Sequence, residues 1–376
     1  MKLNKFFMLG LAGLAFAACS NDDEVTSAMD GDAMVRVNIV TAGSTRAVTD
    51  PVDGTDFATQ EVVVNKIRLK LTAGTVTGNA DVTFDQVKDG KTVMQQAREH
   101  TFTGVRNPQK MEIFINDGVE KMELSQVINT KLAAPMYASA DAKDFNLVKP
   151  EESGNKNYKV KTYEVTLKPQ HKTALLEFSG IKHAEDNGTC AFEKMTFKGI
   201  FMNKIAENEN DLMKISSFND WNAVIATGTD YIWDEVTDGT DFLTSTVAWP
   251  KENKCYAYNV FGNTETLPIL TLYFDNIETK KGFDFFHGAT TGYAAVAKYK
   301  LNVDGMPEVD QTALGVSAKD PYVKTFVPGY IYRIKNIVVP DSAIGPTPAG
   351  GEDVNVLVVE VTVNPWKLVS GTVEWN

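Results

Sequence analysis

Cysteine and histidine are scarce in this sequence of 376 residues, which holds three cysteines and four histidines. Three cysteines are too few for a disulfide scaffold, and the histidines are scattered along the chain. Basic residues are also outnumbered, with 37 Lys and Arg against 49 Asp and Glu, which gives a net charge of −12. An acidic chain lacks the positive patch that nucleic acids select. We therefore expect no nucleic-acid binding, no metal site and no cofactor.

Catalytic motifs are lacking too. The sequence has no Gly-x-Ser-x-Gly elbow, no His-Glu-x-x-His pair, no phosphate-binding glycine loop and no Cys-x-x-Cys pair. Neighbouring acidic residues such as Asp234 and Glu235 stand in polar sequence, with no apolar pocket to raise a pKa. The prediction is a protein that is not an enzyme. Cys190 and Cys255 are interpreted as free thiols, although an exported location leaves a disulfide between them open.

The N-terminus has the pattern of an export signal. Basic Lys2 and Lys5 precede a 13-residue apolar run over 6–18, which is too short to span a bilayer. The run ends in small residues before Cys19, as in the lipobox of bacterial lipoproteins. We predict a signal peptide over 1–18 and a lipidated Cys19 that anchors the precursor in the outer membrane. An ordinary signal peptide followed by an incidental cysteine is the alternative.

Alternating apolar and polar residues predict β-strands through the rest of the chain. Dense Gly, Asn and Asp turns separate them, and helical periodicity is confined to Lys121–Leu132 and Asn219–Ile225. Many short strands favour β-sandwiches, and the charged segment Lys168–Lys172 interrupts two strand patterns. The expected fold is all-β with two tandem sandwich domains. The predicted divisions are a tether and removable strand over 19–46, a first domain over 47–168, a second over 169–344, and a hinge with C-terminal strands over 345–376.

The last strands have an unusual pattern. Val354–Val363 is apolar on both faces, and in Leu368–Trp375 one face carries Val369, Val373 and Trp375. A strand that is apolar on both faces must be covered on both, and an exposed apolar edge invites pairing with another chain. We therefore predict that these strands are donated to a neighbouring subunit. The predicted donor residues are Val354, Val356, Val358, Val361, Val363, Trp366, Val369, Val373 and Trp375.

A possible protease site follows the strand pattern Met34–Val40. The small, polar stretch 43–47 contains Arg46 and is of the kind that proteases prefer. Cleavage between Arg46 and Ala47 would release that first strand. An ordinary flexible linker is the alternative interpretation.

Taken together, these features resemble the fimbrillins, the FimA-type subunits of type V pili of Gram-negative anaerobes. The resemblance rests on the lipobox at Cys19, the strand 34–40 followed by Thr45-Arg46-Ala47, two β domains, and the closing Val-Glu-Val-Thr-Val-Asn-Pro-Trp over 359–366. It implies two transthyretin-like sandwiches and a precursor cut by an arginine-specific protease at Arg46. It also implies that other pilin subunits are the partners, because C-terminal strands fill the groove that the first strand leaves.

The function that the resemblance implies is a structural subunit of the shaft of a cell-surface type V fimbria, which supports adhesion, and two other roles stay open. A fimbrial anchor or tip component would share most of these features. A glycan-binding surface lipoprotein would share the lipobox and the β domains, and would use Trp221, Trp233 or Trp249 as a stacking platform. Core packing is the preferred interpretation of these tryptophans.

Overall fold

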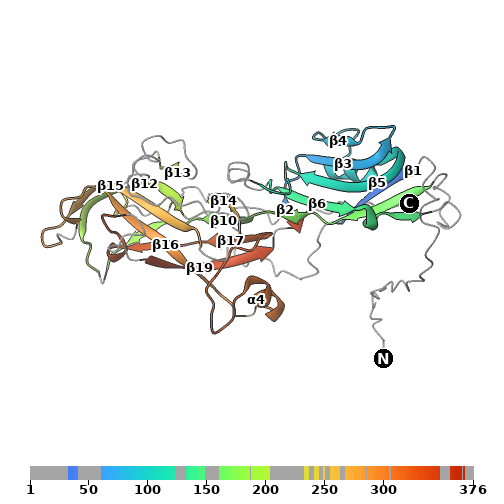
Figure 1. Cartoon of the computed structure of the whole chain (residues 1–376). Helices are drawn as coiled ribbons and strands as arrows, with labels where there is room; N and C mark the ends of the chain where they lie inside the picture. Colours follow the sequence, from blue (N-terminus) through green and yellow to red (C-terminus); the bar gives the residue numbers. More distant parts are fainter. Residues whose placement is uncertain are drawn as a thin grey trace, which may run out of the picture.

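The computed structural model describes residues 33–40, 61–122, 133–148, 161–186, 188–203, 233–236, 241–244, 249, 255–262, 267–283, 286–304, 306–347, 356–365 and 367–368. Strands dominate these residues and gather into two eight-stranded sheets. The two units lie one after the other in Figure 1, with the N-terminal unit in blue to green and the C-terminal unit in green to red. The prediction of an all-β chain with two tandem β units is confirmed.

The N-terminal unit is built on one sheet with the strand order β4-β3-β5-β1-β8-β7, in which β6 pairs with β5 and with β9. Its core consists of the inward-facing aliphatic side chains of these strands, with the short helix α1 packed against them. The elements are β1 (Ala33–Ile39), β3 (Ile67–Val76), β4 (Asp81–Phe84), α1 (Val93–Glu99), β5 (Thr101–Ile115), β6 (Met136–Asp141), the 3-10 turn η1 (Ala142–Asp144), β7 (Asn146–Val148), β8 (Thr162–Leu167) and β9 (Gln170–His171).

The C-terminal unit has the strand order β13-β12-β15-β16-β19-β17-β10-β14. Its core is rich in aromatic rings, and Phe197, Phe242, Phe274 and Trp249 pack against one another. The elements are β10 (Ala174–Phe178), β11 (Lys182–Ala184), β12 (Phe192–Asn203), β13 (Trp233–Glu235), β14 (Tyr256–Val260), β15 (Ile269–Thr279), β16 (Gly292–Leu301), α4 (Glu308–Leu314), β17 (Tyr330–Ile334), β18 (Val338–Pro340), the 3-10 turn η3 (Asp341–Ala343) and β19 (Val356–Pro365).

Two small sheets complete the fold. β11 pairs with β18, and β2 (Glu61–Val62) pairs in parallel with β20 (Lys367–Leu368). The second pair joins the start of the C-terminal tail to the N-terminal unit, since Val62 belongs to the N-terminal core. Leu175 of β10 and Ile331 of β17 also belong to that core. The two units therefore share a packed apolar junction.

The described residues do not test the two helical segments that the sequence predicts. Both predicted helical segments fall largely or entirely outside the described residues. Among the described residues the α-helices are α1, whose Thr92 and Gln95 form a reciprocal capping box, and α4, which is followed by Gly315 in the left-handed conformation. No helix among the described residues is both long and apolar enough to cross a membrane.

Candidate functional site

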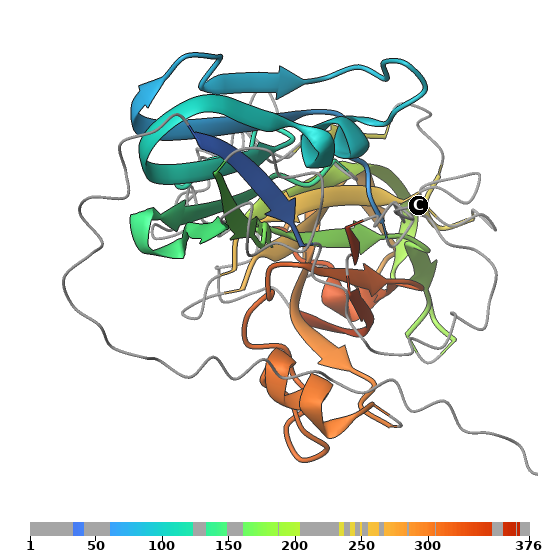
Figure 2. The ribbon, with the colours of Figure 1, turned by 90° about the vertical axis from the view of Figure 1, so that its right-hand side faces the viewer.

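The strand that the sequence predicts to be removable is β1, and it lies inside the N-terminal sheet. β1 runs antiparallel to β5 and parallel to β8, and it is the dark-blue strand near the centre of Figure 2. Ala33, Val35, Val37 and Ile39 point into the core and are almost completely buried. A strand between two neighbours leaves a groove with unpaired backbone on both walls when it departs.

The two walls of the β1 site hold the strand differently. On the β8 side the pairing is continuous from Met34 opposite Thr162 to Ile39 opposite Leu167. On the β5 side the register shifts between Ala33 and Val35. Gly104 of β5 has a positive φ of 63° at this bulge, and a Cβ there would lie 1.6 Å from the Thr77 hydroxyl. The bulge interrupts the ladder, so β8 is the more regular wall of the groove.

The predicted lipidation and cleavage residues Cys19, Arg46 and Ala47 lie outside the described residues. The described part of this segment ends at Val40, whose amide still donates to the carbonyl of Leu167 over 2.9 Å. β1 therefore stays paired up to six residues before the predicted cleavage site in the sequence.

The C-terminal strand β19 lies in the middle of the chain's own C-terminal sheet. It is parallel to β16 and antiparallel to β17. Val359 and Val361 are buried in the core, and Leu357 and Val363 pack against it. Val358 faces the other way and is 51% exposed. If β19 left, the sheet would split into β13-β12-β15-β16 and β17-β10-β14.

Other predicted donor residues are not described. Val354, Trp366, Val369, Val373 and Trp375 lie outside the described residues, and for Val356 the backbone alone is described. What the structure adds is the boundary between two parts of the predicted donor. Residues 356–365 already have a place in the chain's own sheet, and beyond Trp366 only the two residues of β20 are described.

A buried ion pair joins β17, the neighbour of β19, to β10, the next strand of the sheet. Arg333 of β17 lies opposite Thr362 of β19, and its Nε is 2.6 Å from the carboxylate of Glu177 on β10. Both side chains are at most 3% exposed. Because a buried charge without its partner is strongly unfavourable, this pair fixes β17 against β10 and hence the wall on which β19 lies.

The tryptophans do not form a described stacking platform. Trp249 is 2% exposed and packs against Phe197 and Phe242, which is core packing. Trp221 lies outside the described residues, and of Trp233 only the backbone in β13 is described. Cys190 and Cys255 are both free thiols in the structure, and burial raises the pKa of Cys190.

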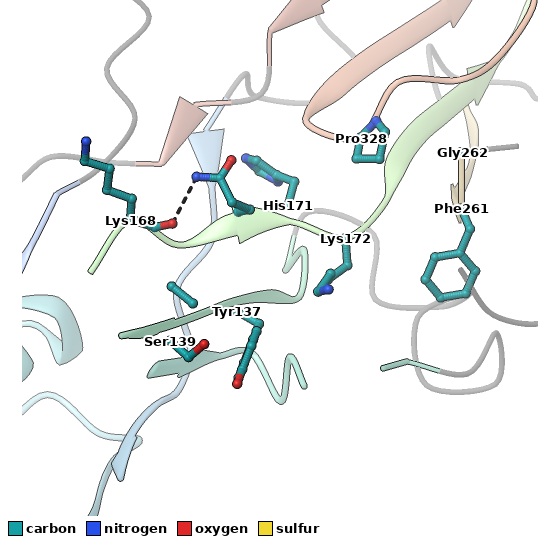
Figure 3. A pocket seen from close by; sticks show the side chains of 10 residues that line it. Tyr137, Ser139, Lys168, His171, Lys172, Phe261, Gly262 and Pro328 are labelled. Carbon is teal, nitrogen blue, oxygen red and sulfur yellow. Dashed lines mark hydrogen bonds between the residues drawn. The ribbon is translucent and has the colours of Figure 1, made fainter. Parts of the chain in front are cut away.

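A cavity of about 490 Å³ lies at the junction of the two units (Figure 3). Its lining includes Tyr137, Lys168, His171, Phe261 and Pro328. The Tyr137 hydroxyl donates to Glu112 over 2.8 Å, so the ring is fixed in place. This hydrogen bond orients one wall of the cavity.

One cluster of possible metal ligands could not be predicted from the sequence. His183, Cys190 and Asp341 place one ligand atom each within 4.8 Å of one another. The histidine and the cysteine are seven residues apart and the aspartate is far downstream, so no local sequence motif predicts the cluster. It becomes visible only because β11 pairs with β18.

No family model matches this chain. A stretch of 66 residues is 39% identical to the major fimbrium subunit FimA type-2 of Porphyromonas gingivalis, covering 18% of this chain and 17% of that relative. The resemblance to FimA-type fimbrillins is confirmed by this match. The chain thus matches about a sixth of the length of this curated relative.

Several solved structures align along most of this chain, with TM-scores below 0.5. A fimbrilin from Porphyromonas gingivalis W83 has a TM-score of 0.46 and 13% identity, covering 91% of this chain and all of the other. A putative cell adhesion protein from Bacteroides eggerthii has a TM-score of 0.42 and 13% identity, covering 90% of this chain and 97% of the other. The tip fimbrial protein Mfa3 from Porphyromonas gingivalis has a TM-score of 0.32 and 14% identity, covering 89% of this chain and all of the other.

Proposed function

We propose that this chain, which resembles the FimA-type fimbrillins, is a structural subunit of a cell-surface fimbrium and polymerises by strand exchange. In this proposal the precursor is lipidated at Cys19 and reaches the outer membrane. An arginine-specific protease then cuts between Arg46 and Ala47 and frees β1. The C-terminal tail of another subunit fills the groove between β5 and β8. The role assigned to the chain is that of the shaft, because it has both a removable strand and a donor end.

The observation that carries this proposal is the position of β1. Val35, Val37 and Ile39 each contribute about 1.5 to 3 kcal/mol by burial, and the backbone is paired on both sides. Departure of β1 exposes the whole row, and a strand with a similar row restores the contacts. The emptied groove is therefore a strong acceptor for an extended segment that is apolar on one face.

The C-terminal tail has the required pattern. Residues 369, 371, 373 and 375 are Val, Gly, Val and Trp, while Ser370, Thr372 and Glu374 form the opposite, polar face. β1 has the same division, with Ala33, Val35, Val37 and Ile39 inward and Met34, Arg36 and Asn38 on the other face. One apolar and one polar face suit a sheet that is covered by a core on one side.

We restrict the proposed donor to the tail after Trp366. The sequence alone suggested that Val354–Val363 is donated as well. In the structure β19 is a central strand, and its departure would split the sheet and uncover Val359 and Val361. The tail carries no such penalty among the described residues, because β20 pairs over only two positions with β2.

Disulfide cross-linking tests this arrangement. Thr166 of β8 is exposed and lies opposite Asn38 of β1, so a donor strand in the groove would pass beside it. Thr166→Cys combined with Thr372→Cys or Glu374→Cys should give covalent ladders of subunits after protease treatment and oxidation. The same double variants carrying Arg46→Ala should give monomers, because β1 still fills the groove.

Two further double-cysteine variants test the position of β19 itself. Lys300 of β16 and Glu360 of β19 are exposed partners in the chain's own sheet, so Lys300→Cys with Glu360→Cys should close a cross-link within one subunit. Ladders from Thr166→Cys with Glu360→Cys would instead show that β19 is the donor. Polymers in which no tail cysteine reaches Thr166 would overturn the proposed exchange.

A further inference from the structure

A three-residue cluster with mixed ligand chemistry lies in the C-terminal unit. His183 is the middle residue of β11, Asp341 begins η3 directly after β18, and Cys190 stands shortly before β12. The parallel pairing of β11 with β18 brings the first two together, with His183 opposite Val339. Their ligand atoms and the Cys190 sulfur lie within 4.8 Å of one another.

The surroundings hold these side chains in place. The His183 Nε2 atom is 2.6 Å from one oxygen of Asp341, and the other oxygen accepts the Ala191 amide hydrogen over 2.6 Å. The Cys190 thiol donates to the carbonyl of Phe192 over 3.3 Å. The His183 and Asp341 side chains are only 6% and 4% exposed. Carboxylates that bind a metal are typically held by a further hydrogen bond of this kind.

We propose that His183, Cys190 and Asp341 form a zinc site. One nitrogen, one sulfur and one carboxylate oxygen suit Zn²⁺, whereas Mg²⁺ and Ca²⁺ prefer ligand sets made of oxygen alone. Ligand atoms around a tetrahedral zinc ion lie about 3.3 to 3.6 Å apart, given the usual bond lengths. Binding requires the His183 and Asp341 atoms to separate slightly and the sulfur to approach, which are side-chain rotations.

Proton balance follows from the ligand types. In the metal-free chain a hydrogen lies between His183 Nε2 and the Asp341 oxygen 2.6 Å away, and metal binding displaces it by exchange with solvent. The neutral ring then carries its proton on Nδ1 and offers the lone pair of Nε2 to the metal. The Cys190 thiol releases its proton to solvent and binds as thiolate, and Asp341 binds as carboxylate. The bound ion thus carries a net charge of zero together with its three protein ligands, which fits a buried position.

A cavity of about 580 Å³ adjoins the proposed site at Asp341. This cavity is lined by Asp341 itself, together with Asp186, Thr189, Ala191 and His287. It provides an entry path and room for a water molecule as fourth ligand. Asp186 accepts the Ser342 amide hydrogen over 2.6 Å, so it supports the turn that carries Asp341.

Cobalt binding to the full chain tests the site directly. Co²⁺ replaces Zn²⁺ in such sites, and a thiolate ligand gives an intense charge-transfer absorption in the near ultraviolet. We expect this band at one equivalent of Co²⁺, and we expect Zn²⁺ to displace it. Cys190→Ser should abolish the band, and His183→Gln should weaken binding at least about tenfold.

The controls separate this site from unspecific binding and from misfolding. Cys255→Ser removes another free thiol of the same unit and should leave the band unchanged. Thermal unfolding of each metal-free variant shows whether it is folded, and added Zn²⁺ should raise the melting temperature of the unchanged chain but not of Cys190→Ser. A band that survives in Cys190→Ser, or a folded chain that shows no band, would overturn the proposal. None of these measurements depends on fimbrial assembly.

Discussion

Two C-terminal truncations distinguish a strand that belongs to the subunit from a strand that is donated. A chain ending at Trp366 keeps β19 and loses the tail, whereas a chain ending at Gly351 loses both. β19 pairs with β16 and β17, and it buries Val359 and Val361 in the C-terminal core. Burial of these two side chains alone is worth about 3 to 6 kcal/mol. Since a whole domain is stable by about 5 to 15 kcal/mol, the shorter chain should not fold normally.

The longer truncation should behave very differently. Among the described residues it removes only β20, which pairs with β2 over two positions. We expect a loss of at most about 1 kcal/mol and a fall in melting temperature of at most about 4 °C. Polymerisation after protease treatment should nevertheless fail, because the row Val369, Val373 and Trp375 is gone.

The assay is thermal unfolding beside the size distribution of protease-treated protein, for both truncations and the full chain. A chain ending at Gly351 that melts within a few degrees of the full chain would refute the central position of β19. A chain ending at Trp366 that still forms polymers would refute the tail as donor.

Four further outcomes are expected. Val37→Asp places a charge in the row of side chains that β1 buries and should destabilise the precursor by more than about 4 kcal/mol. Asn38→Asp on the exposed face should change the stability by less than about 0.5 kcal/mol. Equal effects of the two variants in denaturant unfolding would contradict the burial of that row. Glu177→Gln leaves Arg333 buried without its ion pair and should cost about 3 to 5 kcal/mol, against less than about 1 kcal/mol for Glu99→Gln in the exposed pair with Lys91; similar losses would refute the contrast. Burial raises the pKa of Tyr293 to about 12, so the unfolded chain loses this proton first, and the free energy of unfolding should fall as pH rises from about 10 towards 12. Tyr293→Phe should reduce the slope of this fall with pH, and an unchanged slope would contradict the role of Tyr293. Cys19→Ala should prevent labelling with palmitate and reduce surface fimbriae, and normal labelling would refute lipidation at this residue.

The strands were largely predictable from the sequence, because period-two alternation is a local signal. The alternation predicts strands over 174–178, 192–201, 256–261 and 294–301, which agree closely with β10, β12, β14 and β16, and over 269–274, which is the first half of β15. The alternation over Ile331–Val339 predicts one strand, whereas the structure has two, β17 and β18, and Asn336 between them has a positive φ of 58°. That break depends on a single residue whose conformation the alternation does not reveal.

The partners of a strand were much less predictable. The two apolar faces of Val354–Val363 predict cover on both sides, but in the described strand only the face with Val359 and Val361 is buried, and Val358 on the other face is 51% exposed. They could not reveal whether the chain itself or a neighbour supplies that cover, because pairing partners lie far away in the sequence. The helix α1 was missed although Thr92 and Gln95 form a readable capping box. The cluster of His183, Cys190 and Asp341 depends on the pairing of β11 with β18 and has no local signature at all.

The position of β1 explains why one cut would control assembly in the proposed mechanism. In the precursor β1 is joined to the rest of the chain, so it occupies its groove at a high effective concentration and any competing tail is excluded. Cleavage after Arg46 removes no contact, but it turns β1 into a separate peptide that is lost by dilution once it dissociates. A tail then competes on equal terms, and in a growing fibre it is held near the groove by its own subunit. Because groove and tail lie on different parts of the chain, each new contact leaves another groove and another tail unpaired, and the assembly extends without closing.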